Sequence, residues 1–464
     1  MKMFLQFKVT GLVKEICFSF ITLLGYLFIG INRSFIAFLF HQLEKPDSEI
    51  KINDDQKSWI ASFVVLLSPL GCLFSGVVMD VLGRKLYMQM IFVPFVISWC
   101  IISFASNIEM LYTGVIVQSV GGGMASAVAA YISEIATADN RGALLSTIEI
   151  TYSIGIVISN SLMYLLPWKL VALILALFSA VALGLTFLLP ESPIWLYSKG
   201  QKEKSIQVLE SLRCCDQSQI ESEIQDMDQA CNSSRPKLTI KNTLLGCIRA
   251  WKPFLLAFSL FVLMQNTGYT QLIAYAMMII ERLKLPFQST NIALLYSASG
   301  FIASFLTPFT MHHFNRKTAL TASAIGMTLS LVCVALYEEF FHDELVKPMA
   351  WIVPLALCIH VFSCVLGLLP ITFIITGEIF PLDVRGTLNG VYGVAAYIYY
   401  AAFFKLFPQF LFNFGVKFLF WTYTAFGLVI VLFGIFLLPE TRGITLNEVQ
   451  RKYFSKSSEK KEQA

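Results

Sequence analysis

The sequence contains few charged residues: Asp, Glu, Lys and Arg make up only 14% of its 464 residues, against about 25% in an average soluble domain. Hydrophobic residues make up 56%, and Phe alone occurs 40 times. This composition excludes an ordinary soluble globular protein and indicates a chain that lies largely in lipid. The net charge of +4 is explained by the membrane topology described below, so it does not point to nucleic acid as a partner.

The sequence also lacks the patterns of metal sites, disulfide frameworks and catalytic sites. The ten Cys are scattered, and only Cys214 and Cys215 are adjacent, without the spacing of metal ligands or of a disulfide framework. The sequence has no nucleophile and base at catalytic spacing and no glycine-rich phosphate loop. It therefore predicts no enzyme activity, no metal and no cofactor.

Long apolar runs dominate the chain instead. A spanning helix needs roughly 20 apolar residues, because the hydrocarbon core is about 30 Å thick and a helix rises about 1.5 Å per residue. Twelve stretches meet this requirement, at residues 16–40, 59–79, 86–105, 110–133, 143–166, 168–189, 252–280, 288–311, 318–337, 349–377, 387–411 and 415–438. We therefore predict an all-α membrane protein with twelve transmembrane helices.

Positive residues indicate how these helices are oriented. Lys and Arg concentrate in alternate connections, most of all in the segment 190–251 and in the tail, whereas the segment 41–57 is acidic. Short loops rich in Lys and Arg remain on the cytoplasmic side of a membrane. Because the number of spans is even, we expect both termini to be cytoplasmic.

Short polar motifs recur about half a chain apart. "EIATADNRG" (134–142) returns as "EIFPLDVRG" (378–386), "LLPES" (188–192) returns as "LLPET" (437–441), and "GVVMDVLGRK" (76–85) has a partial copy in "PFTMHHFNRK" (308–317). The copies stand at equivalent helix ends, as in transporters built from two repeats. We predict two pseudo-symmetric six-helix bundles at residues 1–189 and 252–438, joined by a cytoplasmic loop with short amphipathic helices (190–251) and followed by a tail (439–464).

The recurring charges oppose the dipoles of their helices. Glu134 ends the fourth span, where the dipole is partly negative, and Arg141 opens the fifth, where it is partly positive. Each placement costs about 0.3–1 kcal/mol, so both residues need partners on other helices. We predict a cytoplasmic latch of Arg–carboxylate pairs that keeps the inner side closed and breaks when it opens. The alternative is that these are ordinary interfacial charges that set topology.

Together with "PESPIWL" (190–196) and "PETRGITLNEV" (439–449), these motifs resemble the sugar porter family of the major facilitator superfamily, most closely the facilitated trehalose and hexose carriers of insects. The resemblance covers residues 20 to 452 and implies the major facilitator fold, with alternating access to a central sugar site. It also implies a cytoplasmic charge network formed by Asp80, Arg84, Glu134, Arg141, Glu191, Glu378, Arg385 and Glu440.

The resemblance further implies a set of substrate-binding residues. The family's span-seven pattern Q-Q-x-S-G-x-N corresponds to "MQNTGYT" (264–270), while Phe373, Tyr397 and Glu149 occupy family site positions in spans ten, eleven and five. Aromatic faces can cover a sugar ring and the polar groups can hydrogen-bond its hydroxyls, although each side chain could instead serve packing. The candidates are Gln265, Tyr269, Thr270, Phe373, Tyr397, Glu149 and Asn32.

Four ionisable residues lie inside predicted spans and away from the ends of those spans: Arg33, Glu149, His360 and Lys405. A charge at the centre of a span costs roughly 2.5–3.5 kcal/mol and is a functional candidate by default. Arg33 and Glu149 have opposite signs in the same half, so they could pair, or Glu149 could exchange a proton. Alternatively, Arg33 reaches outward to the interface and Glu149 stays protonated.

We therefore expect facilitative transport of a sugar, trehalose or a hexose, by a monomer in the lipid bilayer of the plasma membrane. Proton-coupled symport through Glu149 and a non-transporting sugar sensor are the alternatives. Proton-coupled relatives have an Asp where this sequence has Asn32, which favours facilitation. The tail after Glu440 leaves no room for a folded signalling domain, which argues against a sensor.

Overall fold

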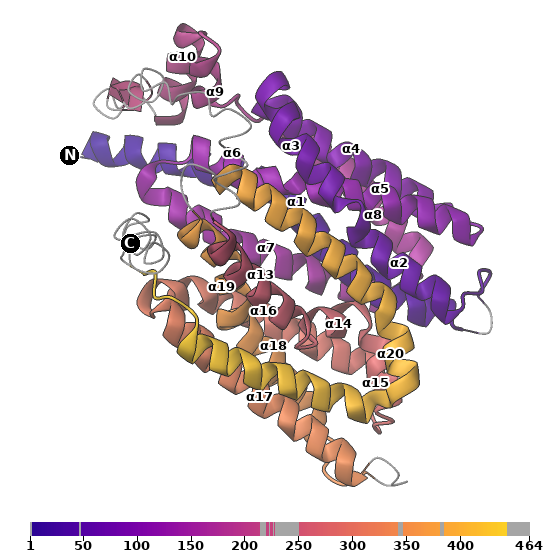
Figure 1. Cartoon of the computed structure of the whole chain (residues 1–464). Helices are drawn as coiled ribbons and strands as arrows, with labels where there is room; N and C mark the ends of the chain where they lie inside the picture. Colours follow the sequence, from indigo (N-terminus) through magenta and orange to yellow (C-terminus); the bar gives the residue numbers. More distant parts are fainter. Residues whose placement is uncertain are drawn as a thin grey trace. The chain divides into compact units, whose positions relative to one another are not determined.

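A computed structural model describes residues 2–45, 48–213, 220–221, 223–225, 227, 250–341, 347–380 and 385–442, apart from the side chains of residues 2–10, 76–77, 126, 138–139, 141–143, 146 and 385–387. Over these described ranges the chain forms helices joined by turns, without a strand (Figure 1). Ten helical segments there are long and apolar enough to cross a membrane. The structure is thus the all-α membrane fold that the sequence predicts.

Ten such segments are compatible with twelve spans. Helix α20 (Arg385–Phe436) includes a 49-residue apolar segment that covers both of the last two predicted spans. At about 1.5 Å per residue this segment is roughly twice the thickness of the hydrocarbon core. Its backbone leaves the helical conformation at Gly415, where φ is 75° and ψ is 173°. We therefore describe α20 as two spans that meet at Gly415.

The chain divides into two compact units. Unit 1 comprises Met1–Ile29, Leu67–Gly155 and Trp168–Leu238, and unit 2 comprises Gly30–Leu66, Ile156–Pro167 and Thr239–Ala464. Helices α1 (Lys2–Leu43) and α7 (Ala138–Leu165) contribute to both. Unit 2 therefore combines parts of the first half of the sequence with the second half. The predicted bundle limits at residues 189 and 252 remain predictions.

Unit 1 is built around α4, which packs against both α5 and α8 (Figure 1). Its helices besides α1 and α7 are α3 (Ser68–Leu82), α4 (Arg84–Ser103), α5 (Ile108–Met124), the 3-10 turn η1 (Ala125–Ala127), α6 (Val128–Ile135), α8 (Trp168–Thr186), α9 (Pro193–Ser198) and α10 (Lys202–Arg213). Helix α3 crosses α5 closely, because a Cβ atom on Gly123 would lie 2.0 Å from the Ser68 carbonyl oxygen. Small residues permit such close approach in lipid.

Within the predicted loop with short amphipathic helices (190–251), residues 202–213 form α10. Leu209 and Leu212, two of its apolar positions, are fully buried, and the Ser205 hydroxyl donates to the Pro193 carbonyl at 2.8 Å. Helix α10 is therefore packed onto α9 rather than free in solution. Six of the ten residues of a second predicted amphipathic segment, 218–227, are described and are helical, and its apolar residue Ile220 is buried.

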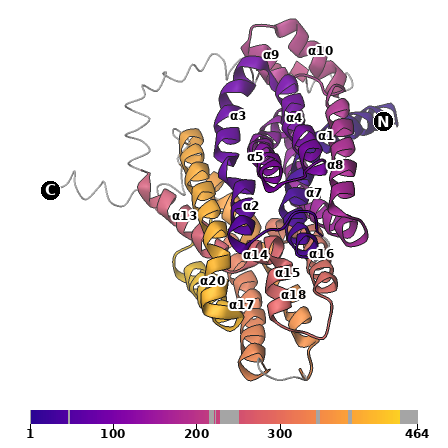
Figure 2. The same ribbon diagram turned by 90° about the vertical axis from the view of Figure 1, so that its right-hand side faces the viewer.

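Unit 2 is organised around α20, which packs against α2, α13 and α17; Figure 2 shows α17 and α20 side by side. The helices of this unit are α2 (Asp54–Leu66), α13 (Trp251–Gln265), α14 (Tyr269–Ala274), α15 (Ala276–Arg282), α16 (Ser289–His313), α17 (Arg316–Phe341), α18 (Ile352–Ser363), the π-helical segment η2 (Cys364–Leu368), α19 (Leu369–Ile379) and α20. Helix α18 packs against α16 and α17.

The seventh predicted span, 252–280, is interrupted, since it consists of α13, α14 and α15. The chain turns at Gly268, whose φ of 87° favours glycine, and a Cβ atom there would lie 2.4 Å from the Tyr423 ring. A break at membrane depth frees carbonyl groups that need donors from neighbouring helices. The His360 Nε2 donates to the Thr267 carbonyl at 3.1 Å. This bond gives His360, one of the four ionisable residues within predicted spans, a structural role.

A second interruption lies where α18 passes through η2 into α19. The Ser323 hydroxyl of α17 donates to the Ser363 carbonyl at 2.6 Å and accepts from the Leu368 amide at 3.0 Å. The Thr307 hydroxyl of α16 donates to the Val365 carbonyl at 3.0 Å. Hydroxyls from two neighbouring helices therefore satisfy backbone groups that the π-helical geometry frees.

We predict that Ser323→Ala lowers the thermal stability of the purified protein in detergent, because it removes the partner of the Leu368 amide and the Ser363 carbonyl. Interhelical hydrogen bonds in membrane proteins contribute about 0.6–1.7 kcal/mol. The matched control is Ser330→Ala on the same helix, because the buried Ser330 hydroxyl bonds only to the Met327 carbonyl one turn away. Equal losses of stability in the two variants would contradict the role given to Ser323.

Candidate functional site

The turn between α3 and α4 places an acidic side chain against a glycine. Gly83 has a φ of 96°, in the region that disfavours residues with a side chain. A Cβ atom on Gly83 would also lie 2.5 Å from Oε2 of Glu191 and 3.2 Å from the Trp195 ring. Glycine is therefore required both by the backbone conformation and by the approach of the carboxylate.

Glu191 caps the N-terminus of α4. Its Oε1 accepts from the Arg84 amide at 2.7 Å, from the Lys85 amide at 3.2 Å and from the Ser192 amide at 2.9 Å. The first amides of a helix have no partner within the helix, and the helix dipole favours a negative charge there. The chain that follows α8 thus supplies the cap of α4, a favourable placement of charge.

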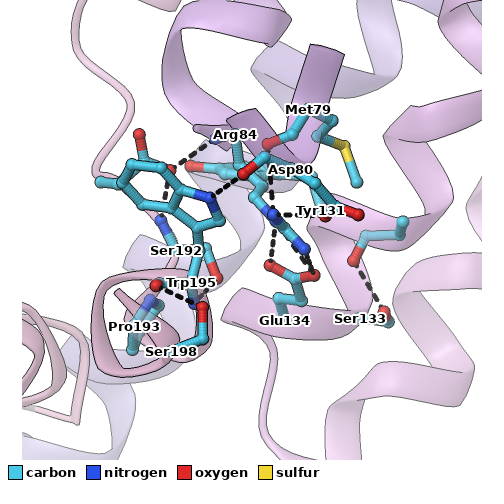
Figure 3. Close-up of polar contacts among 12 residues, drawn as sticks. Met79, Asp80, Arg84, Tyr131, Ser133, Glu134, Ser192, Pro193, Trp195 and Ser198 are labelled. Carbon is cyan, nitrogen blue, oxygen red and sulfur yellow. Dashed lines mark hydrogen bonds and ion pairs between the residues drawn. The ribbon is translucent and has the colours of Figure 1, made fainter. Parts of the chain in front are cut away.

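The side chain of Arg84 links three acceptors at this point (Figure 3). Its Nε and Nη2 donate to the two carboxylate oxygens of Glu134 at 2.9 and 3.0 Å, and Nη1 donates to Asp80 at 3.0 Å and to the Met79 carbonyl at 3.2 Å. Only 12% of the Arg84 side chain and 14% of the Glu134 side chain is exposed. A two-pronged pair this well shielded is stronger than an exposed pair. Glu134 lies at the C-terminal end of α6, where the helix dipole disfavours a negative charge. Arg84 of α4 is the positively charged partner that compensates for this placement.

The second half of the chain repeats this arrangement. Glu440 accepts from the Arg316 and Lys317 amides at the N-terminus of α17, both at 3.1 Å. The Arg316 side chain donates to Glu378 at 3.0 Å through Nη2 and to the Met311 carbonyl at 2.6 Å through Nη1. The two copies therefore have the same four parts. Each has a capping glutamate, an arginine, the carboxylate that this arginine binds, and a methionine carbonyl that accepts from the same arginine.

The copies differ at their edges. His312 stands at the position of Asp80, and Asn315 at that of Gly83, while the Thr441 hydroxyl adds a hydrogen bond to Glu378 in the second copy. The arginine that binds Glu378 is Arg316, which the family pattern had not placed in the network. The side chains of Arg141 and Arg385 lie outside the described residues, so their roles remain predictions.

Each network joins helices of one half of the sequence. The first links α3, α4 and α6 to the chain after α8, and the second links α16, α17 and α19 to the chain after α20. Such links fasten helix ends, so each set of helices can move as one body. The predicted latch between the two halves remains a prediction.

A third cluster of charges was not foreseen from the sequence. Glu15 of α1 is 2% exposed, and its carboxylate accepts from the Thr137 amide at 3.2 Å, from Asn140 Nδ2 at 3.0 Å and from Arg213 Nη1 at 2.8 Å. Arg213 ends α10, is 3% exposed, and also pairs with Glu223 at 2.7 Å. Thr137 and Asn140, two residues of the motif "EIATADNRG" that differ between its two copies, therefore bind the carboxylate of Glu15. Glu15 in turn anchors α10 to α1 through Arg213.

Several candidate substrate residues are brought together in unit 2. The Thr270 hydroxyl donates to Gln265 Oε1 at 2.8 Å and lies 3.3 Å from Gln271 Oε1. The Tyr400 side chain interacts with Thr270, and the guanidinium of Arg33 lies 4.6 Å from the centre of the Tyr400 ring. Residues from α1, α13, α14 and α20 thus form one connected group.

Two further candidates adjoin this group in the sequence. Asn32, next to Arg33, is 4% exposed, and its Oδ1 has no hydrogen-bond partner among the described residues. Tyr269, next to Thr270, is buried, and its carbonyl accepts from the Tyr296 hydroxyl at 3.5 Å. Both positions are enclosed by protein.

The remaining candidates are at least partly exposed. Phe373 of α19 is 51% exposed, Tyr397 is half-buried, and Glu149 is half-buried in unit 1. Lys405 pairs with Asp55 at 2.5 Å, at the first turn of α2. The proposed roles of Phe373, Tyr397 and Glu149 remain predictions, whereas Lys405 has a clear electrostatic partner.

We predict that Arg84 and Glu134 are energetically coupled. In a double-mutant cycle with Arg84→Ala and Glu134→Ala, thermal unfolding should give a coupling energy of about 1–3 kcal/mol, because the pair is two-pronged and shielded. The control cycle uses Lys417 and Glu339, a 2.8 Å pair that is 40% and 44% exposed, for which a smaller coupling energy is expected because water screens exposed charges. Additive effects of Arg84→Ala and Glu134→Ala would rule out the coupling.

We also predict that Glu15→Leu loosens α10, because it leaves the buried guanidinium of Arg213 without its closest carboxylate on α1. Removing one member of a buried pair typically costs about 3–5 kcal/mol. Limited proteolysis should then cut the segment 190–213 faster, and Glu15→Leu combined with Arg213→Leu should recover part of the protection. Lys14→Leu serves as control, since Lys14 makes only an exposed bond to the Ser211 carbonyl. Unchanged cleavage in Glu15→Leu would refute this anchoring role.

Comparison with solved structures shows the fold. The inward-open xylose transporter XylE from E. coli superposes with a TM-score of 0.76 at 18% identity, covering 94% of this chain and 99% of that one. The proton:xylose symporter XylE bound to 6-bromo-6-deoxy-D-glucose superposes with a TM-score of 0.74 at 20% identity, covering 95% and 99%. The chain therefore has the fold of the major facilitator superfamily, as the sequence predicts.

Comparison of sequences shows the family. The chain is 30% identical to the sugar transporter ERD6-like 6 of Arabidopsis thaliana over 402 residues, which is 82% of this chain and 79% of the relative. It is 26% identical to the facilitated trehalose transporter Tret1 of Apis mellifera ligustica over 92% of this chain and 86% of the relative. It is also 26% identical to the mouse solute carrier family 2 facilitated glucose transporter member 6, over 93% and 90%. The model of the "Sugar (and other) transporter" family matches residues 16–453, and the chain belongs to this family of transporters.

Proposed function

We propose that the protein carries a sugar, trehalose or a hexose, across the membrane by facilitated alternating access. The observation that carries this proposal is the duplicated network, in which Arg84 and Arg316 occupy equivalent places in a chain of the sugar transporter family. Two equally fastened sets of helices are what rocking of one half against the other requires. Trehalose and glucose are named as cargo for relatives of this chain.

Ion pairs in unit 2 support a mechanism in which the two halves separate. His41 of α1 lies 2.9 Å from Glu281 of α15, and Lys405 of α20 lies 2.5 Å from Asp55 of α2. Each pair joins the first half of the sequence to the second, and both are partly exposed. Exposed pairs contribute only about 0.2–1 kcal/mol each. Contacts this weak can break and re-form during each transport cycle.

Buried polar groups in unit 2 suit a ligand with many hydroxyls. The Nε2 of Gln271 and the Oδ1 of Asn32 are buried and have no hydrogen-bond partner among the described residues. An unpaired buried donor or acceptor costs about 1–3 kcal/mol, which a bound hydroxyl would recover. The Thr270 hydroxyl, which donates to Gln265, lies 3.3 Å from Gln271 Oε1, and the aromatic ring of Tyr400 can cover the C–H face of a sugar.

The proposal includes the membrane, the orientation and the oligomeric state. We place the protein in the plasma membrane as a monomer, in contact with lipid and with both termini cytoplasmic, on the basis of the Lys and Arg distribution. Proton-coupled symport through Glu149 and a sugar sensor are the alternatives. The neutral Asn32 favours facilitation, because no ionised carboxylate stands at that position of α1.

Uptake by proteoliposomes tests this proposal. We expect saturable uptake of labelled trehalose, glucose or fructose that is insensitive to an imposed proton gradient, and a loss of uptake in Gln265→Ala, whose side chain accepts from Thr270. Protein-free liposomes and the exposed-site variant Lys417→Gln are the controls. Uptake that follows the proton gradient and disappears in Glu149→Gln would establish symport instead. A folded, reconstituted protein that takes up none of these sugars would favour the sensor.

A further inference from the structure

Arg33 is a cation of unit 2 without a carboxylate. Its Nη1 is buried and has no hydrogen-bond partner, and within the described part of unit 2 its guanidinium contacts only the face of the Tyr400 ring, at 4.6 Å. Arginine stays protonated in proteins, so this positive charge is permanent. Arg33 as a whole is half-buried, and a permanent charge within a membrane span normally has an opposite charge beside it.

Six acidic residues of unit 2 are bonded to basic side chains other than Arg33. Glu44 and Asp54 both pair with Lys57, Asp55 pairs with Lys405, and Glu281 pairs with His41. Glu338 pairs with Lys347 and Glu339 with Lys417. None of these six carboxylates forms an ion pair with Arg33, so none of them serves as its counter-charge.

The position of Arg33 connects it to the candidate sugar site. Tyr400, over which the guanidinium lies, also interacts with Thr270, and Thr270 donates to Gln265. Gln271, 3.3 Å from Thr270, has an unpaired amide donor, and Asn32, next to Arg33 in the sequence, has an unpaired acceptor. A cation, hydrogen-bonding groups and an aromatic face therefore occur in one connected group.

On the basis of the proposed carrier function, we infer that the carrier accepts a monoanionic sugar, a sugar carboxylate, besides neutral sugars, and that Arg33 binds the carboxylate group of this cargo. The planar guanidinium can donate two parallel hydrogen bonds to a carboxylate. The hydroxyls of the sugar bond to Gln265, Gln271 and Asn32. Because Arg33 is a single charge, it matches a carboxylate and not a doubly charged phosphate ester.

The test measures uptake of labelled D-glucuronate and D-glucose by proteoliposomes containing the full chain. These probes share a ring and differ in one carboxylate. We expect saturable uptake of glucuronate, faster with a positive interior potential because the cargo carries one negative charge. Arg33→Gln should lower glucuronate uptake at least about tenfold, the effect of losing a hydrogen bond to a charged group, while glucose uptake changes less than about twofold. Arg33→Lys should retain part of the uptake, because it keeps the charge but not the planar fork.

The matched control is Lys417→Gln, the same loss of charge in an exposed pair of unit 2, which should leave both uptakes unchanged. Saturable glucose uptake without glucuronate uptake or competition would overturn the inference and leave the proposed function intact. An equal loss of both uptakes in Arg33→Gln would also overturn it, as would uptake of glucose 6-phosphate comparable to that of glucuronate. If Arg33→Gln combined with Glu149→Gln regained glucuronate uptake, the partner of Arg33 would be Glu149 rather than the cargo. If the proteoliposomes took up neither neutral nor acidic sugars, the carrier function and the inference would both be overturned.

Discussion

The structure depends on one constraint: the bilayer core contains no water, so every backbone N–H and C=O group there must be hydrogen-bonded within the protein. Most of the chain meets it with uninterrupted helices. Where a helix is broken, another helix supplies the partner: His360 reaches the carbonyl freed beside Gly268, and Ser323 bonds to both sides of the π-helical segment. Polar residues inside the spans are thus placed where the backbone requires them. Both breaks lie in unit 2, which also holds the candidate sugar site.

The same logic operates at the helix ends, with charges in place of hydroxyls. Glu191 and Glu440 each satisfy the first amides of a helix that begins more than 100 residues earlier in the chain. Arg84 and Arg316 then neutralise the carboxylates that end α6 and α19. Each network therefore stabilises the fold in two ways. Its glutamate caps the first amides of a helix, and its arginine neutralises a carboxylate at the negative end of another helix dipole. This explains why the motifs recur together.

Much of this could be read from the sequence, and what could not has a physical cause. The spans follow from apolar length, and the partner of Glu134 had to be a cation on another helix. Arg316 was harder to place, because its copy of the motif has lost the Asp and both glycines that mark the first copy. The contact between Glu15 and Arg213 joins residues almost 200 positions apart, and no local pattern encodes such a distance. Around the candidate sugar site, sequence order shows which side chains are present but not which of their polar atoms are left unpaired.

The caps on α4 and α17 have a consequence for biosynthesis. Glu191 lies 107 residues after Arg84, at the start of α4, and Glu440 lies 124 residues after Arg316, at the start of α17. Each capping glutamate is therefore synthesised after all the helices that its network joins. Until that glutamate has been made, the first amides of α4 or α17 lack their acceptor. Each network can thus close only after the last helix of its set has been synthesised.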